Sequence, residues 1–130
     1  MNEVLEYLKK CKVFYIATEE GSQPRVRPFG VIEEFEGKLY IQTGKIKEVS
    51  KQIQINSRIE ICACDGPTWI RVAAKANRDD RREAKEYILD HYPDLKAMYS
   101  ADDDNTEVLY LSDVTATFYS FTDKPRVVTF

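Results

Sequence analysis

The sequence of 130 residues predicts a mainly β domain, an antiparallel barrel with short helices inserted between its strands. Short runs rich in valine, isoleucine, tyrosine and phenylalanine recur along the chain and are separated by turn residues. Helical periodicity is confined to a few short segments, and the strands follow one another without strict βαβ alternation. A chain of this length builds one core, so residues 1–130 are treated as a single domain.

Periodicity and turn chemistry locate the elements of the N-terminal half. Val4, Leu5 and Leu8 recur at helical spacing, which predicts a short amphipathic helix over residues 2–10. The residues EGK at 36–38 are typical of a tight turn between two strands. Strands are predicted at residues 13–18, 25–35 and 39–43.

A second helix is predicted over residues 45–56, because the spacing of the apolar residues changes there. Ile46, Val49 and Ile53 stand at i, i+3 and i+7 and therefore share one helix face. The helix is expected to end near Asn56.

The C-terminal half contains a third helix among further strands. Asp80 and Glu83 match the spacing of a capping box, and Pro93 is expected to stop the helix that they open. The predicted inward face of this helix carries Ala84, Tyr87, Ile88 and His91. Strands are predicted at residues 58–64, 69–76, 108–114 and 115–121.

Composition and charge exclude several classes of protein. The net charge of -3 and the pI of about 5.3 argue against general nucleic-acid affinity, so any basic patch is local. No apolar run approaches the roughly 20 residues of a membrane span. The charged N-terminus MNEVLEYLKK does not resemble a secretory signal. We therefore expect a cytoplasmic protein that binds neither nucleic acid nor membrane.

The three cysteines, an odd number, do not indicate a disulfide framework. Cys62 and Cys64 would share one face of a strand. No second pair of cysteines or histidines completes a tetrahedral metal site, so we predict no metal centre. Both cysteines are expected to be buried as small apolar side chains.

The residues TGKIKEVSKQIQIN, at 43–56, concentrate lysines at the start of a helix in an acidic protein. A helix N-terminus attracts anions, and Gly44 would let the backbone approach a phosphate closely. Lys47 and Lys51 project from one side of the helix, and Thr43 adds a hydroxyl. These features indicate a phosphate site. A solvated helix face is the alternative, and the strand before the helix weighs against it.

That strand contains PRVRPFG, in which alternation places Arg25 and Arg27 on one face and Val26 and Pro28 on the other. Two like charges on one face repel each other unless an anion or solvent separates them. Pro28 cannot donate to a strand ladder and therefore marks an edge or an interruption. We interpret the strand as the lip of a pocket, with a solvated edge as the alternative.

The segment TWIRVAAKA presents two faces of different chemistry. Its core face carries Ile70, Val72, Ala74 and Ala76. Trp69 and Arg71 share the outward face, where an aromatic ring beside a cation suits an interface or a flat anionic ligand. Together, a phosphate site, an arginine-lined strand and an aromatic surface indicate a phosphorylated aromatic cofactor.

Three segments resemble the pyridoxamine 5'-phosphate oxidase-like, FMN-binding split-barrel family. They are PRVRPFGVIEEFEGKLYIQTG (24–44), KIKEVSKQIQIN (45–56) and the strand pair RIEICAC…WIRVAAKA. The resemblance extends from residue 13 to residue 121 and rests on the order and spacing of these segments. It implies a six-stranded antiparallel split β-barrel and a homodimer with two FMN sites across the subunit interface.

The resemblance also implies which residues bind FMN. The strand along its ribityl chain and isoalloxazine consists of Arg25, Val26, Arg27 and Pro28. Arg25 is expected to reach towards the phosphate, and Gln42 and Thr43 to line the site where the third strand ends.

The same family pattern assigns the phosphate and the contacts from the second subunit. Lys47 would bind the phosphate, assisted by Lys45, Ser50 and Lys51. Trp69 and Arg71 would approach the flavin from the other subunit.

The implied function is that of a small FMN-dependent oxidoreductase acting on an unidentified small molecule. The flavin carries the chemistry in such proteins, and no catalytic residue can be assigned from this sequence. True pyridoxamine phosphate oxidases bind the substrate phosphate through a C-terminal segment with arginine and histidine. Here only Lys124 and Arg126 stand near that position, so oxidation of pyridoxamine phosphate is not expected.

Two alternatives stay open at this point: a non-catalytic module that stores or senses flavin, and a deazaflavin-dependent reductase. Haem-binding relatives of the family need an iron ligand, for which the chain offers a single histidine. That residue, His91, is expected to be a packed or surface side chain.

Overall fold

The strands form one antiparallel sheet in the computed structural model, which describes all residues from 1 to 130. The strands are β1 (Phe14–Glu20), β2 (Gln23–Phe29), β3 (Ile32–Phe35), β4 (Lys38–Gly44), β5 (Arg58–Asp65), β6 (Thr68–Asp79), β7 (Thr106–Ser120) and β8 (Arg126–Thr129). The helices are α1 (Asn2–Cys11), α2 (Glu48–Ile55), α3 (Arg82–His91) and the 3-10 helix η1 (Pro93–Ala97). The predicted mainly β class with short helices is confirmed.

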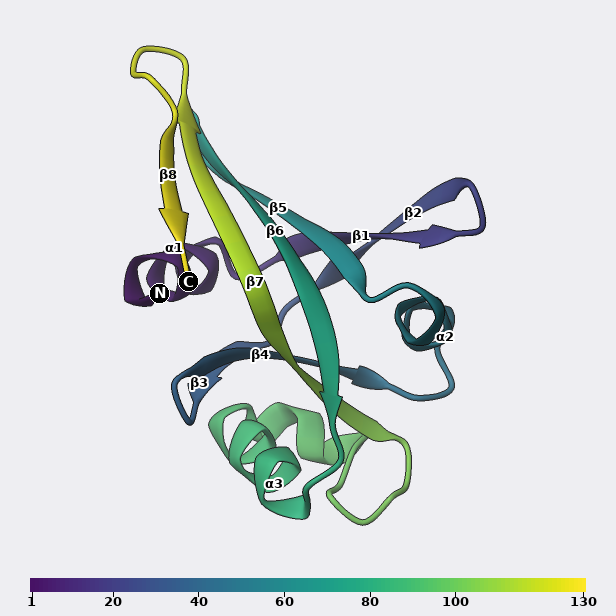
Figure 1. The fold of residues 1–130 in the computed structure, drawn as a ribbon. Coiled ribbons are helices and arrows are strands. Elements are labelled where there is room, and N and C mark those ends of the chain that lie inside the picture. The colour runs from purple at the N-terminus through teal and green to yellow at the C-terminus, as the bar shows by residue number, and fades with distance from the viewer.

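The sheet is strongly curled but does not close into a barrel (Figure 1). Its strand order is β2-β1-β5-β6-β7-β4-β3, with β8 added on β7. The family resemblance implied a six-stranded split barrel; the sheet has eight strands and stays open between β2 and β3, which is consistent with a split barrel. The single extended segment predicted at 25–35 is in fact these two strands, which pair at opposite ends of the sheet.

Two long strands, β6 and β7, cross the whole molecule and join its two halves (Figure 1). The strands predicted at 108–114 and 115–121 are one continuous strand, β7, with an irregularity near Asp113. Asp113 has a φ of 50°, and its carboxylate lies 3.3 Å from the ammonium of Lys75 on β6. β8 was not predicted, because it has only four residues and lacks the alternation of a half-buried strand.

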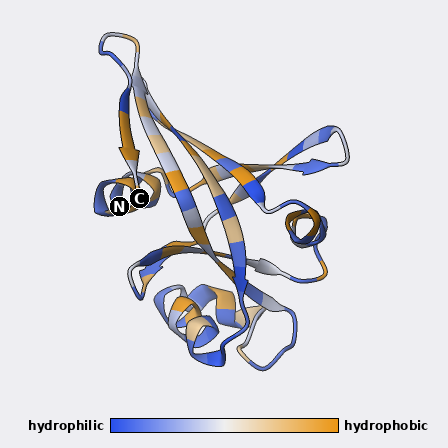
Figure 2. Cartoon of the chain, in the orientation of Figure 1, coloured by the Kyte–Doolittle hydropathy of each residue, from blue (hydrophilic) through white to orange (hydrophobic).

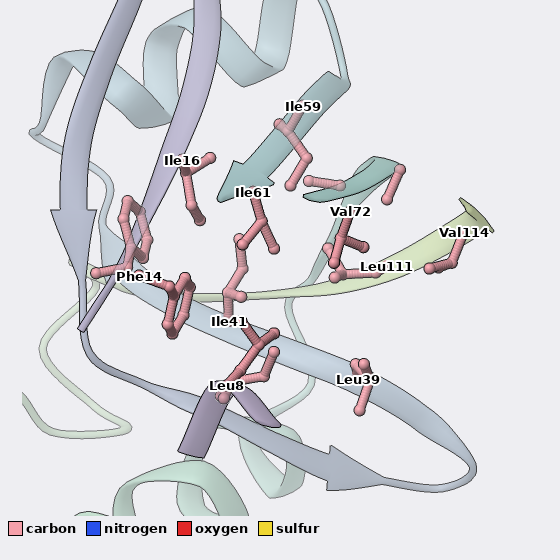
Figure 3. Packing of buried hydrophobic residues seen from close by; sticks show 14 of the residues in the cluster. Leu8, Phe14, Ile16, Leu39, Ile41, Ile59, Ile61, Val72, Leu111 and Val114 are labelled. Atoms are coloured by element: carbon pink, nitrogen blue, oxygen red, sulfur yellow. The ribbon is translucent and has the colours of Figure 1, made fainter. Parts of the chain in front are cut away.

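The main core lies inside the curl of the sheet (Figure 3). Side chains from β1, β4, β5, β6 and β7 meet there, and α1 adds Leu8 from one open end. Hydrophobic and hydrophilic residues alternate along the central strands, as Figure 2 shows. On β5, Ile61 and Ala63 face the core, so Cys62 and Cys64 point outward and are exposed. Their predicted burial was therefore wrong.

A smaller core joins α3 to the other side of β4 and β7. It is formed by Val31, Tyr40, Ala84, Ile88 and Val108. α3 begins at Arg82, after β6 has continued to Asp79, and it has no side-chain cap. The predicted capping box of Asp80 and Glu83 therefore does not form. Pro93 ends the helix as expected and begins η1.

No helix combines the length and the apolar character that a membrane crossing requires.

A buried carboxylate, Asp79, fastens the end of β6 to β4. The hydroxyl of Tyr40 donates to it at 2.8 Å, and both the backbone N–H and the guanidinium of Arg81 donate to it as well. Arg81 lowers the pKa of Asp79 to about 2, and the bond from Tyr40 contributes. Burial, together with the bond to Asp79, raises the pKa of Tyr40 to about 12.

Replacing this carboxylate is expected to destabilise the fold in a pH-dependent way. The folded pKa of about 2 lies below the ordinary value of 3.8, so the ionised group stabilises the fold above about pH 4. Asp79→Asn should lower the free energy of unfolding at pH 7 by about 2 kcal/mol. The difference from the parent protein should shrink as the pH falls from 4 to 2.

Urea unfolding at a series of pH values measures this difference. Asp123→Asn is a suitable control, because Asp123 is exposed and its carboxylate makes no bond within the chain. If the free energies of unfolding of Asp79→Asn and the parent differ by the same amount down to pH 2, the lowered pKa of Asp79 is contradicted.

Candidate functional site

A cleft of about 680 Å³ lies beside the open edges of the sheet. Its walls are the junction of β2 and β3, the end of β4, the start of α2, and the segment at 91–99. The volume is within the range of small-molecule and cofactor sites. Five of the predicted cofactor residues line it: Arg27, Pro28, Gln42, Thr43 and Lys47.

The last residues of β4 form the floor of the cleft. Gln42 and Thr43 are 6% and 3% exposed, and both pair with β7, opposite Val108 and Glu107. The amide nitrogen of Gln42 donates to the Thr43 carbonyl at 3.0 Å. The Thr43 hydroxyl has no hydrogen-bond partner within the chain and is accessible from the cleft, since Glu107 Oε1 is the only fully buried side-chain atom without a partner.

Arg27 lines the cleft, but most of its donors are used inside the protein. Its guanidinium donates to the Ile16 carbonyl at 3.1 Å, to the Thr18 hydroxyl at 2.7 Å, and to the Gln52 side chain at 2.8 Å. Burial and the neighbouring charge of Arg25 lower the pKa of Arg27. Arg27 thus ties the edge strand β2 to β1 and α2 and places a positive charge beside the cleft.

The other predicted residues of β2 are divided between solvent and cleft. Arg25 is exposed and pairs with Glu20 at 2.9 Å near the tip of the β1–β2 hairpin. Val26 is 67% exposed on the opposite face. Neither lines the cleft of its own chain, whereas Pro28 does. The strand is therefore the lip of a pocket at one end and a solvated edge at the other.

The predicted helix at 45–56 begins three residues later than expected. Lys47 has extended backbone angles, and α2 starts at Glu48. Asn105 holds the preceding turn: its carbonyl and its side-chain oxygen accept the N–H groups of Lys45 and Ile46 at 2.7 and 3.1 Å. The N–H groups of Glu48 and Val49 have no partner within the chain, and they are the ones left to bind an anion.

Only one of the predicted phosphate-binding lysines is both unpaired and in the cleft. Lys45 points towards Asp80 and Asp104, at 3.8 and 3.6 Å. Lys51 pairs with Glu48 at 3.1 Å on the helix surface. Lys47 lines the cleft and forms no ion pair.

Ser50 is buried under the first turn of α2 rather than open to the cleft. It is 1% exposed, and its hydroxyl lies 3.5 Å from the guanidinium of Arg78. Arg78 in turn pairs with Glu107, which is completely buried and has one carboxylate oxygen without a partner. This ion pair was not predicted, because Arg78 and Glu107 lie far apart in the sequence and meet only through the β6–β7 pairing.

The wall opposite α2 consists of residues that sequence reasoning did not assign to the site. The hydroxyl of Tyr92 donates to the Ile32 carbonyl at 2.6 Å and accepts the Ile32 N–H at 3.3 Å, which fixes η1 on β3. His91 is exposed and lines the cleft, although it was expected on the inward face of its helix. Its Nδ1 donates to the Tyr87 carbonyl at 2.8 Å, so Nε2 is free.

Trp69 and Arg71 lie outside the cleft of their own chain. Trp69 stacks on Tyr119 with a centroid distance of 5.3 Å and lines a separate cavity of about 420 Å³ beside α1. Arg71 pairs with Glu60 at 2.8 Å on the outer face of the sheet. The structure confirms that both residues point outward, as predicted, but brings neither to the other candidate residues.

Both the sequence and the fold match known proteins. A family model described as pyridoxamine 5'-phosphate oxidase matches residues 1–119. The crystal structure of a NimC/NimA family protein from Clostridium acetobutylicum is 45% identical, with a TM-score of 0.96 over 100% of this chain and 92% of that one. Comparison with curated proteins finds no match.

More distant structures share the fold. A putative pyridoxamine 5'-phosphate oxidase from Listeria innocua has a TM-score of 0.70 at 15% identity, covering 98% of this chain and 96% of that one. A heme binding protein from Mycobacterium smegmatis has a TM-score of 0.71 at 17% identity, covering 91% of this chain and 52% of that one. The match of the family model along most of the sequence shows that the chain belongs to the pyridoxamine 5'-phosphate oxidase family.

Proposed function

We propose that the cleft binds FMN, with the phosphate at the start of α2, and that the protein is an FMN-dependent oxidoreductase acting on a small molecule. One observation carries the proposal. Unused donors meet at one corner of the cleft: the Thr43 hydroxyl, the Lys47 ammonium, and the N–H groups of Glu48 and Val49. The Thr43 hydroxyl reaches the cleft and has no partner within the chain, so it is available to a ligand that accepts hydrogen bonds.

A phosphate fits these donors well. It carries negative charge and several acceptor oxygens, which suit an ammonium, a hydroxyl and a helix N-terminus together. The rest of the cleft suits a flat ring system. Apolar and aromatic side chains line it, namely Phe29, Val31, Val49, Tyr92, Leu95, Met98 and Tyr99.

In this proposal, the residues of the protein bind and orient the flavin. Lys47 and Thr43 hold the phosphate, Arg27 adds positive charge, and the segment at 91–99 limits the access of water. Bound FMN would supply hydride or electron transfer, and no side-chain acid or base is required for that. The substrate and the electron donor are left unassigned.

The proposal includes a homodimer with the flavin sites at its interface. The outer face of β1, β5 and β6 combines apolar and aromatic residues with charged ones, among them the Arg71–Glu60 ion pair. Its residues include Tyr15, Cys62, Cys64, Trp69 and Ala73. Covering this face with a second copy would remove apolar surface from water and could bring Trp69 and Arg71 to the cleft of the partner.

Haem is a second candidate ligand, because the free Nε2 of His91 lies at the cleft and imidazole is a common ligand of haem iron. Titration of the purified protein with FMN, with a deazaflavin and with haemin, followed by absorbance, separates the candidates. Saturation at one FMN per chain supports the proposal. If only haemin or only the deazaflavin binds, that molecule is the ligand instead of FMN. If FMN binds but nicotinamide donors are not turned over, the protein stores or senses flavin.

Lys47→Ala tests the phosphate site directly. The variant should bind FMN roughly tenfold or more weakly, because it loses a charge-assisted hydrogen bond, while the affinity for riboflavin should hardly change. Isothermal titration with both flavins measures the effect. Lys51→Ala is the matched control, since Lys51 lies in the first turn of α2, outside the cleft, and pairs with Glu48. Equal losses for FMN and riboflavin would show that Lys47 does not contact the phosphate.

A hybrid dimer tests the contribution of the second subunit. Lys47→Ala and Trp69→Ala are each expected to weaken both FMN sites of a homodimer. A hybrid of the two variants, co-expressed with different tags, should contain one intact site and one doubly altered site. It should therefore bind one FMN per two chains with the parent affinity. If the purified hybrid has no tight site, Trp69 does not reach the partner's cleft.

A further inference from the structure

Gly44 makes room for an aromatic side chain rather than for a ligand. A Cβ atom at this position would lie 3.2 Å from both Cε1 and the hydroxyl of Tyr99, and 3.1 Å from the side-chain nitrogen of Asn105. Such distances are shorter than ordinary van der Waals contact. The absence of a side chain therefore lets the ring edge and hydroxyl of Tyr99 rest on the end of β4. The expectation that Gly44 admits a phosphate to the backbone is replaced by this contact.

Tyr99 lines the same cleft as the unused donors, and its hydroxyl lies beside Gly44, on the face of β4 opposite to the Thr43 side chain. Tyr99 lines the cleft together with Thr43 and Lys47, and Gly44 directly follows Thr43 in β4. The hydroxyl of Tyr99 makes no hydrogen bond within the chain, and a phenolic hydroxyl that contacts a ligand is normally paired. The Thr43 hydroxyl, which also has no partner within the chain, is a further donor at the end of β4 that an acceptor-rich ligand could use.

The surroundings of Tyr99 hold its ring in place. The segment that carries it is fixed to β3 by the two hydrogen bonds between Tyr92 and Ile32. The backbone N–H of Tyr99 donates to the Leu95 carbonyl at 2.8 Å, which continues the turn of η1. Because these bonds fix the segment that carries the ring, the Tyr99 hydroxyl loses less freedom on binding a ligand.

We propose that Tyr99 is a specificity-determining residue of the cleft. Its hydroxyl donates a hydrogen bond to the phosphate of the bound ligand, and Gly44 positions the ring. This favours a phosphorylated flavin over its unphosphorylated form. The inference rests on the proposed binding of FMN, and it adds a ligand from the wall opposite α2 to those from the helix itself.

The test compares FMN, riboflavin and inorganic phosphate as ligands of the parent protein and of Tyr99→Phe. The variant keeps the ring and loses only the hydroxyl. It should bind FMN roughly tenfold more weakly, and should bind riboflavin within about twofold of the parent. The ³¹P resonance of bound FMN should also shift. Tyr87→Phe is the matched control, because that hydroxyl is also unpaired but lies outside the cleft.

A double-mutant cycle tests the role of Gly44. Gly44→Ala should weaken FMN binding by displacing the Tyr99 hydroxyl, and adding Gly44→Ala to Tyr99→Phe should cost much less than it costs in the parent. Circular dichroism and the urea midpoint establish that each variant is folded. Fully additive losses would overturn the positioning role of Gly44.

The outcomes also distinguish this inference from the proposed function. If the parent binds FMN more tightly than riboflavin and Tyr99→Phe keeps the same preference, the role of Tyr99 is overturned and FMN binding stands. If the parent binds neither FMN nor inorganic phosphate, both proposals fail.

Discussion

The site depends on the short crossing between β2 and β3. Pro28 cannot donate to a ladder, and the chain then passes through Gly30 to the other edge of the sheet. Phe29 is anchored in the main core and Val31 in the core under α3, so the crossing is held at both ends. Because β2 and β3 each pair with one strand only, the sheet stays open there. The cleft occupies this opening, with the hydroxyl of Tyr92 satisfying the backbone of the exposed edge.

Most of the positively charged side chains near the cleft are bonded to groups within the protein. Arg27 is bound to β1 and α2, and Arg78 is bound to the buried Glu107 under α2. A buried carboxylate with one unpaired oxygen is costly, and the pair contributes by fixing the strands against the helix rather than by large net stabilisation. Since these arginines set the position of α2, Lys47 and the first N–H groups of the helix are presented without internal partners. Rigid donors of this kind bind an anion with little loss of entropy.

Local patterns predicted the elements and the faces of the strands well. The alternation in β6 correctly separated a buried face from the outward Trp69 and Arg71, because a strand must alternate and the core takes one face. The same rule was available for β5, yet Cys62 and Cys64 were judged by residue type instead of by their alternation with Ile61 and Ala63. The division of 25–35 into two edge strands has no local signal beyond Pro28 and Gly30. Pairing between distant strands decides it.

The sequence by itself determined the mainly β class and the family, and it directed attention to the end of β4 as the candidate anion site, because these follow from residue order and short-range periodicity. Tertiary structure decided which groups are free to act there. Lys45 and Lys51 were equivalent to Lys47 in the sequence. In the structure they form ion pairs with acidic neighbours and are therefore not free to bind a ligand. Tyr99 and His91 entered the site because η1 folds back over the cleft. Ion pairing and burial are properties of contacts between distant segments, so local sequence patterns do not contain them.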